Sequence, residues 1–570
     1  MSPRKEPKTS VLWQALTSDL PRLGRPGSRS SRLHIESPLV TAISGDDLAS
    51  QDTYRGLTAL DKLRFAALRW LGTCGSLLLG FAALGAGALP VVGNPYNDLP
   101  GGKILSQLLP AASVLAFIGI GLVVLAWVLM APLVGSALPG QRARRGSVST
   151  GMLWRTAVAW ILPLLITAPL FTQDIYSYLA QGSITRQGLD PYSAGPIDLL
   201  GVDHHLARSV PFIWAHSPSP YGPVALGIAA LVSEISQDSI VIGVLLHRLF
   251  GVAGLAIGGW ALIKLSRRCG VNPAAAVWLG MLNPLTVLHL VGGIHNESLM
   301  VGLMLLGLEL TFRGHDRLDR LDKVDFGVLA FWLGAGGIMA GAGMVKVSAF
   351  LAIAFTGAAI ARDLYWRWQS HWKALGAAML IEFSALVGSI ILVSLSTGIG
   401  TGWITGQGGA AQIRSWMSIT TDIGVIFGWL GMLLDLGDHT DAMLVFTRAA
   451  GLILAGLWTS RMLWAAYCAQ IAAVGGLGVS MFVVVLLFPV VHPWYFLWAI
   501  VPLSAWANRP FFRTSVVSYS AFISLILLPR GLSLPPSTVA NIYITAALAF
   551  VVVVFIGWWG LRKWGVNTLD

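Results

Sequence analysis

The sequence predicts an all-α protein that crosses a membrane many times. Of its 570 residues, 55% are hydrophobic and only 11% are charged, and the mean hydropathy is +0.70. Soluble domains carry a charged fraction of about 25%, so a polytopic membrane protein is indicated. The 23 Trp and 64 Gly residues are typical of aromatic belts at the membrane interface and of closely packed membrane helices.

The charge and cysteine content narrow the possible partners. A net charge of +11 would suggest nucleic acid in a soluble chain, but here it reflects Lys and Arg kept in cytoplasmic loops, and no nucleic-acid partner is expected. The three cysteines, Cys74, Cys269 and Cys468, are an odd number without metal-ligand spacing. They predict packing residues rather than a disulfide framework.

The chain divides into two parts. Residues 1–56 are polar, have no apolar region typical of a secretory signal, and predict a largely disordered cytoplasmic extension with a short helix around Val11 to Leu20. Residues 57–570 form the predicted transmembrane domain.

A crossing helix needs about 20 apolar residues, and Lys and Arg mark the cytoplasmic ends. On this basis we expect about 14 crossings with both termini in the cytoplasm. The expected spans are about 69–90, 108–134, 153–171, 239–263, 273–292, 298–312, a hairpin over 326–361, 374–396, 441–460, 471–489, 494–508, 514–529 and 540–561.

Two long segments lie outside the membrane in this arrangement. Residues 172–238 form the first large external loop, whose stretch from Pro223 to Glu234 is short for a crossing and suits an interfacial helix. Residues 397–440 form the second. We interpret 419–437 as re-entrant or interfacial, because a crossing there would reverse the charge rule downstream.

Asp174 is the main candidate for chemistry. The apolar third span ends at Phe171, and Asp174 follows three residues later at the membrane edge. An acid at this position is costly unless it faces a water-filled cavity or a partner. It could equally cap a helix end. As a functional group it would be a general base that takes a proton from an acceptor hydroxyl.

Other polar residues of the predicted spans and loops gather on the same external side. Lysine, arginine, histidine and tyrosine can bind the phosphate of a lipid-linked donor, whereas tyrosine, tryptophan and polar side chains suit sugar binding. The phosphate candidates are Lys346, Arg414, His492 and Tyr495. The sugar and acceptor candidates are Tyr176, Tyr178, Gln181, Arg186, Asp190, Tyr192, Tyr221, His295, Asn296, Glu297, Trp416 and Trp494.

Structural roles remain open for several of these residues. Lys346 could reach for the membrane interface as an anchor, and His492 could simply end a helix before Pro493. His295, Asn296 and Glu297 could form a polar hairpin turn. No metal-ligand spacing, phosphate-binding loop or dinucleotide motif is present, so we expect no cofactor and no nucleotide-sugar donor.

Six runs of sequence carry a resemblance to a known family. They are QDIYSYLAQGSITRQGLDPYSAGP, SPYGPVALGI, GGIHNESLMVGLML, RSWMSITTDIG, LGDHTDAMLVFTRAAG and LLFPVVHPWYFLWAIVPLSAWA. In this order, over about residues 57–565, the chain resembles the polyprenol-phosphomannose-dependent α-(1→6)-mannosyltransferases, most strongly their MptB type. These enzymes have the membrane-embedded C-type glycosyltransferase fold.

The resemblance implies an inverting transfer of mannose at the outer face of a bacterial plasma membrane. The donor would be polyprenyl-phosphomannose, and the acceptor a phosphatidylinositol mannoside or lipomannan. Asp174 matches the position of the family's presumed base. Many relatives carry two adjacent acids there, whereas this chain has Gln173-Asp174, which puts a metal requirement in doubt.

Two other functions remain open. A transporter or flippase of lipid-linked sugars would share the apolar composition, but it usually shows internal repeats, and none is evident here. A related enzyme could use another polyprenyl-phosphate sugar, such as arabinose, because the fold does not fix the sugar.

Overall fold

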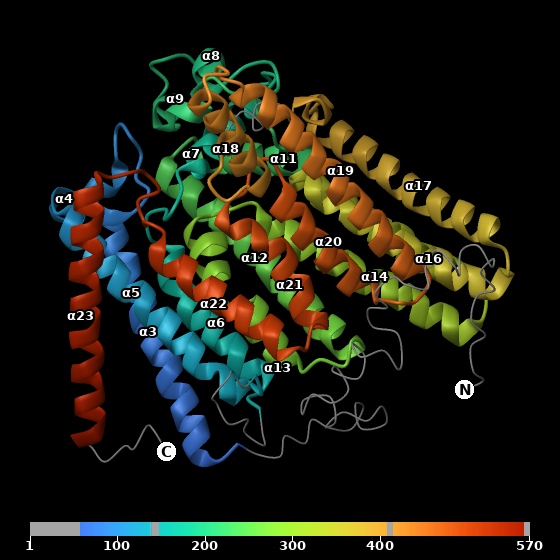
Figure 1. The fold of residues 1–570 in the computed structure, drawn as a ribbon, viewed down its shortest axis with the longest axis horizontal. Coiled ribbons are helices and arrows are strands. Elements are labelled where there is room, and N and C mark those ends of the chain that lie inside the picture. Colours follow the sequence, from blue (N-terminus) through green and yellow to red (C-terminus); the bar gives the residue numbers. More distant parts are fainter. Residues whose placement is uncertain (1–56, 137, 139–146, 407–413, 564–570) are drawn as a thin grey trace.

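The predicted all-α architecture is confirmed in a computed structural model. The structure describes residues 57–136, 138, 147–406 and 414–563, which form helices and connecting loops without a β-strand (Figure 1). The expected extension over 1–56, with its short helix, lies outside the described residues.

Eight helical segments among the described residues are long and apolar enough to cross a membrane. They are α3 (Ala59–Ala86), α5 with η3 (Leu109–Val134), α12 (Ile240–Arg268), α15 (Phe326–Val345), η5 with α16 (Val347–Trp368), α17 (His371–Thr397), α19 (Thr440–Tyr467) and most of α23 (Pro536–Lys563). A ninth arises if η4 (Thr286–Gly292), a π-helix, and α14 (Glu297–Leu321) form one broken span bent by 113°.

Shorter helices fill the remaining expected spans, so helix length alone does not confirm the count of 14. They are α6 (Thr150–Leu165), α13 (Pro273–Gly280), α20 (Ala473–Leu487), η9 (Pro493–Phe496), α21 (Leu497–Trp506) and α22 (Pro510–Ile526). α18 (Ile419–Leu433) has 15 residues, fewer than the roughly 20 of a full crossing.

Residues 172–238, the predicted first external loop, contain the helices that carry or cover the candidate site. They are α7 (Asp174–Arg186), α8 (Pro196–Leu200), α9 (His205–Ser209), α10 (Phe212–Ala215) and α11 (Pro223–Ser236). Two further short elements, η2 (Pro95–Asp98) and α4 (Gly102–Gln107), follow α3. The expected interfacial helix in this loop is confirmed as a helix by α11, which packs on α7.

Glycines bring the central helices into direct contact. A Cβ on Gly302 of α14 would lie 2.1 Å from the carbonyl oxygen of Gly254 on α12. A Cβ on Gly75 of α3 would lie 2.6 Å from the carbonyl oxygen of Gly119 on α5. Small residues permit such backbone approach in membrane proteins, and the α12–α14 contact lies only five residues after Glu297, where α14 begins.

The outer helices leave apolar side chains uncovered. α17 and α23 lie at opposite edges of the bundle (Figure 1), and Leu392, Leu395 and Phe555 on them are exposed. Exposed apolar faces on helices of this length suit contact with lipid. α8 and α9 lie at the top of Figure 1, whereas α3 begins and α23 ends near the bottom.

Candidate active site

Two breaks between consecutive helices place acidic residues in one region. α6 ends at Leu165 before Asp174 begins α7, and η4 ends at Gly292 before Glu297 begins α14. Each link contains a non-glycine residue with positive φ, Phe171 at 66° and Ile294 at 57°, three positions before the acid. Such conformations cost on the order of 1–3 kcal/mol and persist only where the surroundings enforce them.

Arg248, a buried residue of α12, holds both links in place. Its Nη1 donates to the carbonyl oxygens of Leu165 (2.7 Å) and Thr167 (2.8 Å). Its Nε donates to the carbonyl oxygen of Val291 (3.1 Å). The guanidinium thus satisfies the free carbonyl groups at the ends of α6 and η4 together, where the helix dipole also favours a positive charge.

The contacts of Arg248 form a joint between the link that precedes α7 and the link that precedes α14. Direct backbone hydrogen bonds complete this joint. The amide of Leu170 donates to the carbonyl oxygen of Gly292 (3.1 Å), and the amide of Phe171 donates to that of Pro529 (2.6 Å). A Cβ on Gly531 would lie 2.7 Å from the carbonyl oxygen of Phe171. The link before Asp174 is therefore held between the end of η4, at Gly292, and the loop that contains Pro529 and Gly531.

Asp174 has a defined set of neighbours. Its Oδ1 accepts a hydrogen bond from Nε1 of Trp214 (3.2 Å), a residue of α10. Its Oδ2 lies 3.9 Å from Nδ1 of His295. The side chain is 23% exposed, so the carboxylate is enclosed but reachable.

The surroundings tune the basicity of this carboxylate. Burial raises the pKa of Asp174 above its usual range, and the negative charge of Glu297 acts in the same direction. Hydrogen bonds from Thr172 and Trp214 and the positive charge of Lys346 oppose the rise. A raised pKa makes a carboxylate a better proton acceptor than a solvated aspartate.

A buried ion pair lies beside Asp174. Nζ of Lys346, between α15 and η5, donates to Oε1 of Glu297. The ammonium also lies 4.1 Å from the ring centroid of Tyr495 and 5.0 Å from that of Trp498. Lys346 is therefore directed into the protein and held by one carboxylate and two aromatic faces.

Aromatic rings stack behind this pair. The rings of His295 and Trp494 have centroids 4.0 Å apart, and those of Trp494 and His492 are 4.7 Å apart with a 9° angle between their planes. Burial lowers the pKa of His492 to about 4, with the charge of Lys346 acting in the same direction. At neutral pH His492 is thus an uncharged hydrogen-bonding group.

The tyrosines of α7 have different environments. The hydroxyl groups of Tyr178 and Tyr221 lie 3.4 Å apart, and their rings meet edge to face. The charge of Asp174 contributes to the raised pKa of Tyr221, after the effect of burial. Tyr176, in contrast, is buried and donates its hydroxyl proton to the carbonyl oxygen of Ala88 (2.8 Å).

Three other candidates in the predicted first external loop form contacts within that loop. Oε1 of Gln181 accepts from Oγ of Ser219 (3.0 Å), and the Tyr192 hydroxyl donates to the carbonyl oxygen of Tyr221 (3.0 Å). Oδ1 of Asp190 accepts from the amide of Tyr192. These contacts shape the loop above α7.

Further candidates lie apart from the carboxylate. Arg186 binds Asp238 at 2.9 Å, at the far end of α7 from Asp174. Arg414 binds Asp441 at 3.2 Å on the surface, and Trp416 is 65% exposed. None of these three has a described contact with the residues around Asp174.

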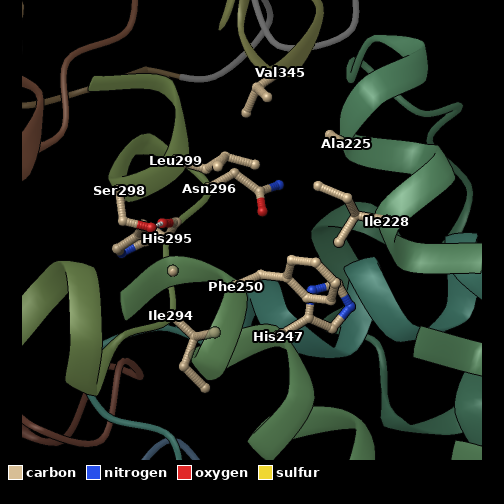
Figure 2. Close-up of a pocket in the computed structure, with 11 residues that line it drawn as sticks. Ala225, Ile228, His247, Phe250, Ile294, His295, Asn296, Ser298, Leu299 and Val345 are labelled. Carbon is tan, nitrogen blue, oxygen red and sulfur yellow. Dashed lines mark hydrogen bonds between the residues drawn. The ribbon is translucent and has the colours of Figure 1, made fainter. Parts of the chain in front are cut away.

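A small pocket opens next to the site. Asn296, His295 and Ser298 line it together with His247 and Phe250, and Figure 2 shows the Asn296 side chain pointing into the space. Its volume of about 20 Å³ has room for about one water molecule. It is too small for a sugar in this conformation.

Sequence reasoning did not single out three neighbours of the site. Trp214 contacts Asp174 across 40 positions of sequence, and Trp498 faces Lys346 from another helix. Arg248 carried no more signal than any polar residue inside a span. Only the tertiary contacts give these residues a role.

The described residues contain no group of three or more His, Cys, Asp or Glu side chains that could hold a metal ion. The side chains of Asp174, Lys346 and the surrounding aromatic residues offer acid–base and electrostatic chemistry. A tuned carboxylate, a lysine and several aromatic rings suit transfer of a sugar between a hydroxyl group and an anionic leaving group. The fold and the site are those of a membrane-embedded glycosyltransferase.

Comparison with known proteins narrows this class. Residues 69–362 match the family model described as α-(1→6)-mannopyranosyltransferase, N-terminal domain, and residues 420–555 match the MptB C-terminal domain. The chain belongs to the α-(1→6)-mannopyranosyltransferase family and is a mannosyltransferase. This membership favours an enzyme over the transporter considered above.

Curated relatives cover nearly the whole chain. α-(1→6)-Mannopyranosyltransferase B of Corynebacterium glutamicum is 54% identical over 95% of this chain and 92% of its own length. An α-(1→6)-mannopyranosyltransferase of Mycobacterium tuberculosis is 36% identical over 87% of both chains. The solved archaeal oligosaccharyltransferase AglB from Archaeoglobus fulgidus aligns at 10% identity with a TM-score of 0.32, over 69% of this chain and 56% of that chain.

Proposed function

We propose that the protein is an inverting C-type glycosyltransferase that moves mannose from polyprenyl-phosphomannose to a phosphatidylinositol mannoside or lipomannan. The product linkage is α-(1→6), and transfer takes place at the outer face of the bacterial plasma membrane. The observation that carries this proposal is the enclosed Asp174 carboxylate beside the Lys346–Glu297 pair.

Asp174 is the general base in this proposal. It takes the proton of the acceptor 6-hydroxyl group as that oxygen attacks C1 of the mannose. The bond between C1 and the phosphate oxygen breaks, and the electron pair leaves with the polyprenyl phosphate. Attack opposite the leaving group converts a β-linked donor into an α-linked product.

Lys346 binds the donor phosphate in this proposal. A lysine ammonium has three N–H donors, and the structure commits one of them to Glu297. The others can contact phosphate oxygens and balance the charge that develops during departure. His492 and Tyr495 line the same region and add neutral hydrogen-bonding groups.

The orientation of the chain follows the same proposal. Residues 57–570 form the transferase domain, and Lys and Arg cluster in the loops expected to be cytoplasmic. α3 begins and α23 ends on the side of the bundle opposite α8 and α9 (Figure 1), which supports cytoplasmic termini and an external site.

A reconstituted transfer assay tests the proposal. Purified protein receives polyprenyl-phosphomannose and a phosphatidylinositol mannoside, and mannose transfer is measured. Because a general base contributes about 10²- to 10⁴-fold, Asp174→Asn should lower kcat by about 100-fold or more while the protein stays folded. Full activity of Asp174→Asn would remove Asp174 from this role, and failure of the wild type with this donor would refute the proposed substrate.

A further inference from the structure

A second, larger pocket lies away from Asp174, among the loop after α3, the short helix α9 and the start of α12. Its volume is about 280 Å³. Its lining includes Val92, Pro95, His205, Arg208, Asp238 and Val241. Neither the base nor the donor-phosphate site uses these side chains.

The pocket is lined by a cationic side chain, Arg208, that is free to bind an anion. Asp238 is paired with Arg186 at 2.9 Å and accepts a hydrogen bond from Oγ of Ser183 at 2.8 Å. The same arginine also lies 3.8 Å from Glu234, outside the pocket lining. Arg208 is exposed, and its guanidinium has no ion pair or hydrogen bond within the described part of the chain. Nε2 of His205 lies 3.0 Å from the backbone carbonyl oxygen of Asp238 and lines the same space. The pocket therefore favours an anion.

The apolar surroundings indicate that this anion belongs to a lipid. Val91, Val92 and Ile242 beside the pocket are 63%, 42% and 49% exposed. α12 starts at Ile240 and is long enough to cross the membrane, so the pocket lies at the end of a spanning helix. A basic group next to exposed aliphatic side chains at the end of a spanning helix suits a phospholipid. The phosphate would lie in the pocket and the acyl chains along the helix.

The pocket is close enough to Asp174 to serve the same molecule. The Gln173 side chain, adjacent to Asp174, donates to the carbonyl oxygen of Leu89 (2.6 Å). Val92 lies three residues further along, within about 11 Å of Leu89 even in a fully extended chain. A phospholipid anchored here could thus present a sugar headgroup to the carboxylate.

We propose that this pocket binds the phosphate of the acceptor phospholipid and anchors the lipid during transfer. The inference rests on the proposed function only for the identity of this lipid as the acceptor. Arg208 pairs with the phosphodiester, and Val92 and Ile242 contact the first part of the acyl chains. The mannose donor binds elsewhere, at Lys346.

Direct binding tests the pocket without catalysis. The full-length protein in detergent is titrated with short-chain phosphatidylinositol, and Kd is compared among wild type, Arg208→Gln and Lys103→Gln. Lys103 is the matched control, an exposed cation on α4 that does not line the pocket. Loss of a charge-assisted contact of about 1.5–3 kcal/mol should raise Kd about 10- to 100-fold in Arg208→Gln, with no change in Lys103→Gln.

A volume-filling variant and a second probe complete the test. Val92→Trp should block phosphatidylinositol binding by occupying the pocket. Inorganic phosphate should bind more weakly than the lipid, because it makes no aliphatic contacts. An unchanged Kd in both Arg208→Gln and Val92→Trp would overturn the proposal. Inorganic phosphate binding as tightly as phosphatidylinositol would also overturn it, because the pocket would then be a free-anion site.

Kinetics separate this inference from the proposed function. In the transfer assay, Arg208→Gln should raise KM for the acceptor about 10-fold or more and leave KM for the donor and kcat unchanged. An inactive Asp174→Asn with an unaffected Arg208→Gln would refute the anchor alone. Loss of lipid binding in Arg208→Gln with an active Asp174→Asn would refute the base alone.

Discussion

Asp174 draws its proposed function from contacts with side chains distant in sequence. Trp214 donates to one carboxylate oxygen, His295 lies beside the other, and Glu297 adds a second negative charge. These neighbours enclose the group and raise its pKa, yet they leave one edge of the carboxylate reachable. The same residue at an open helix end would be an ordinary solvated cap.

The raised pKa of Asp174 predicts a pH dependence. Only the ionised carboxylate accepts a proton, so activity should fall as the pH falls through this pKa, at a higher pH than the usual value of about 3.9 allows. The hydrogen bond from Trp214 stabilises the ionised form. Trp214→Phe should therefore raise the pKa further and move the acidic limb of kcat upward by about one pH unit.

The control for this measurement is Phe212→Ala. Phe212 lies on the same short helix, α10, and is almost fully exposed. It should leave the acidic limb in place. An acidic limb that stays unchanged in Trp214→Phe, or that moves equally in Phe212→Ala, would contradict the assigned role of the hydrogen bond.

Lys346 and Arg414, the two cations predicted to bind the donor phosphate, lie in different environments. Lys346 is held inside the site, whereas Arg414 pairs with Asp441 on the surface. Lys346→Ala should raise KM for polyprenyl-phosphomannose about 10- to 100-fold, because a charge-assisted contact is lost. Arg414→Ala should change it less than about threefold. Equal effects of the two substitutions on donor KM would show that the donor reaches both residues.

Among the helices, the joint around Arg248 positions the site. One guanidinium binds carbonyl groups at the ends of α6 and η4, and each of these ends leads through a strained residue to an acid that begins the next helix. The break before α14 and the link before α7 are thus held together by the same side chain, Arg248. A shift in either would separate Asp174 from Glu297 and His295.

Substitution of Arg248 tests this coupling. Arg248→Met removes all the carbonyl contacts while keeping a flexible apolar side chain, so both links should loosen together. Amide hydrogen exchange should accelerate over 166–173 and over 291–296, and kcat should fall about 10-fold or more. Arg248→Lys should restore part of kcat, because an ammonium can satisfy some of the carbonyl groups.

The neighbouring residue Leu249 supplies the control. It is 45% exposed on the same helix, so Leu249→Ala should leave exchange in both segments unchanged. Faster exchange in only one of the two segments of Arg248→Met would show that the links are independent. Unchanged kcat despite faster exchange would show that the joint does not position the catalytic group.

For the molecule as a whole, the orientation in the membrane decides whether the site is external. Asp203 lies in the loop between α8 and α9, and Lys323 lies in the loop between α14 and α15, and both are exposed. In a variant without Cys74, Cys269 and Cys468, a cysteine replacing Asp203 should react with a membrane-impermeant maleimide in intact cells. A cysteine replacing Lys323 should react only after permeabilisation, and the reverse pattern would invert the proposed topology.

Much of the helical framework follows from local sequence. Apolar length predicted the spans realised by α12, α17 and α19, because about 20 apolar residues satisfy their backbone hydrogen bonds only as a helix in lipid. Helix length supports eight or nine of the 14 expected crossings among the described residues. Helices such as α20 and α21 are shorter than a full crossing, and their boundaries depend on packing rather than on length.

Composition and hydrophobic periodicity thus determined an all-helical membrane protein, and the acid after an apolar stretch marked Asp174 as a candidate. Composition and periodicity could not show that Asp174 contacts Trp214. They also could not show that Lys346 and Arg414, both predicted to bind the donor phosphate, have different environments. Those distinctions arise because folding brings together residues that are distant in sequence, such as Asp174 with Trp214 and His295 with Trp494, and because it encloses some charges and leaves others in solvent. The free energy of a charged group depends on that enclosure, which local sequence does not encode.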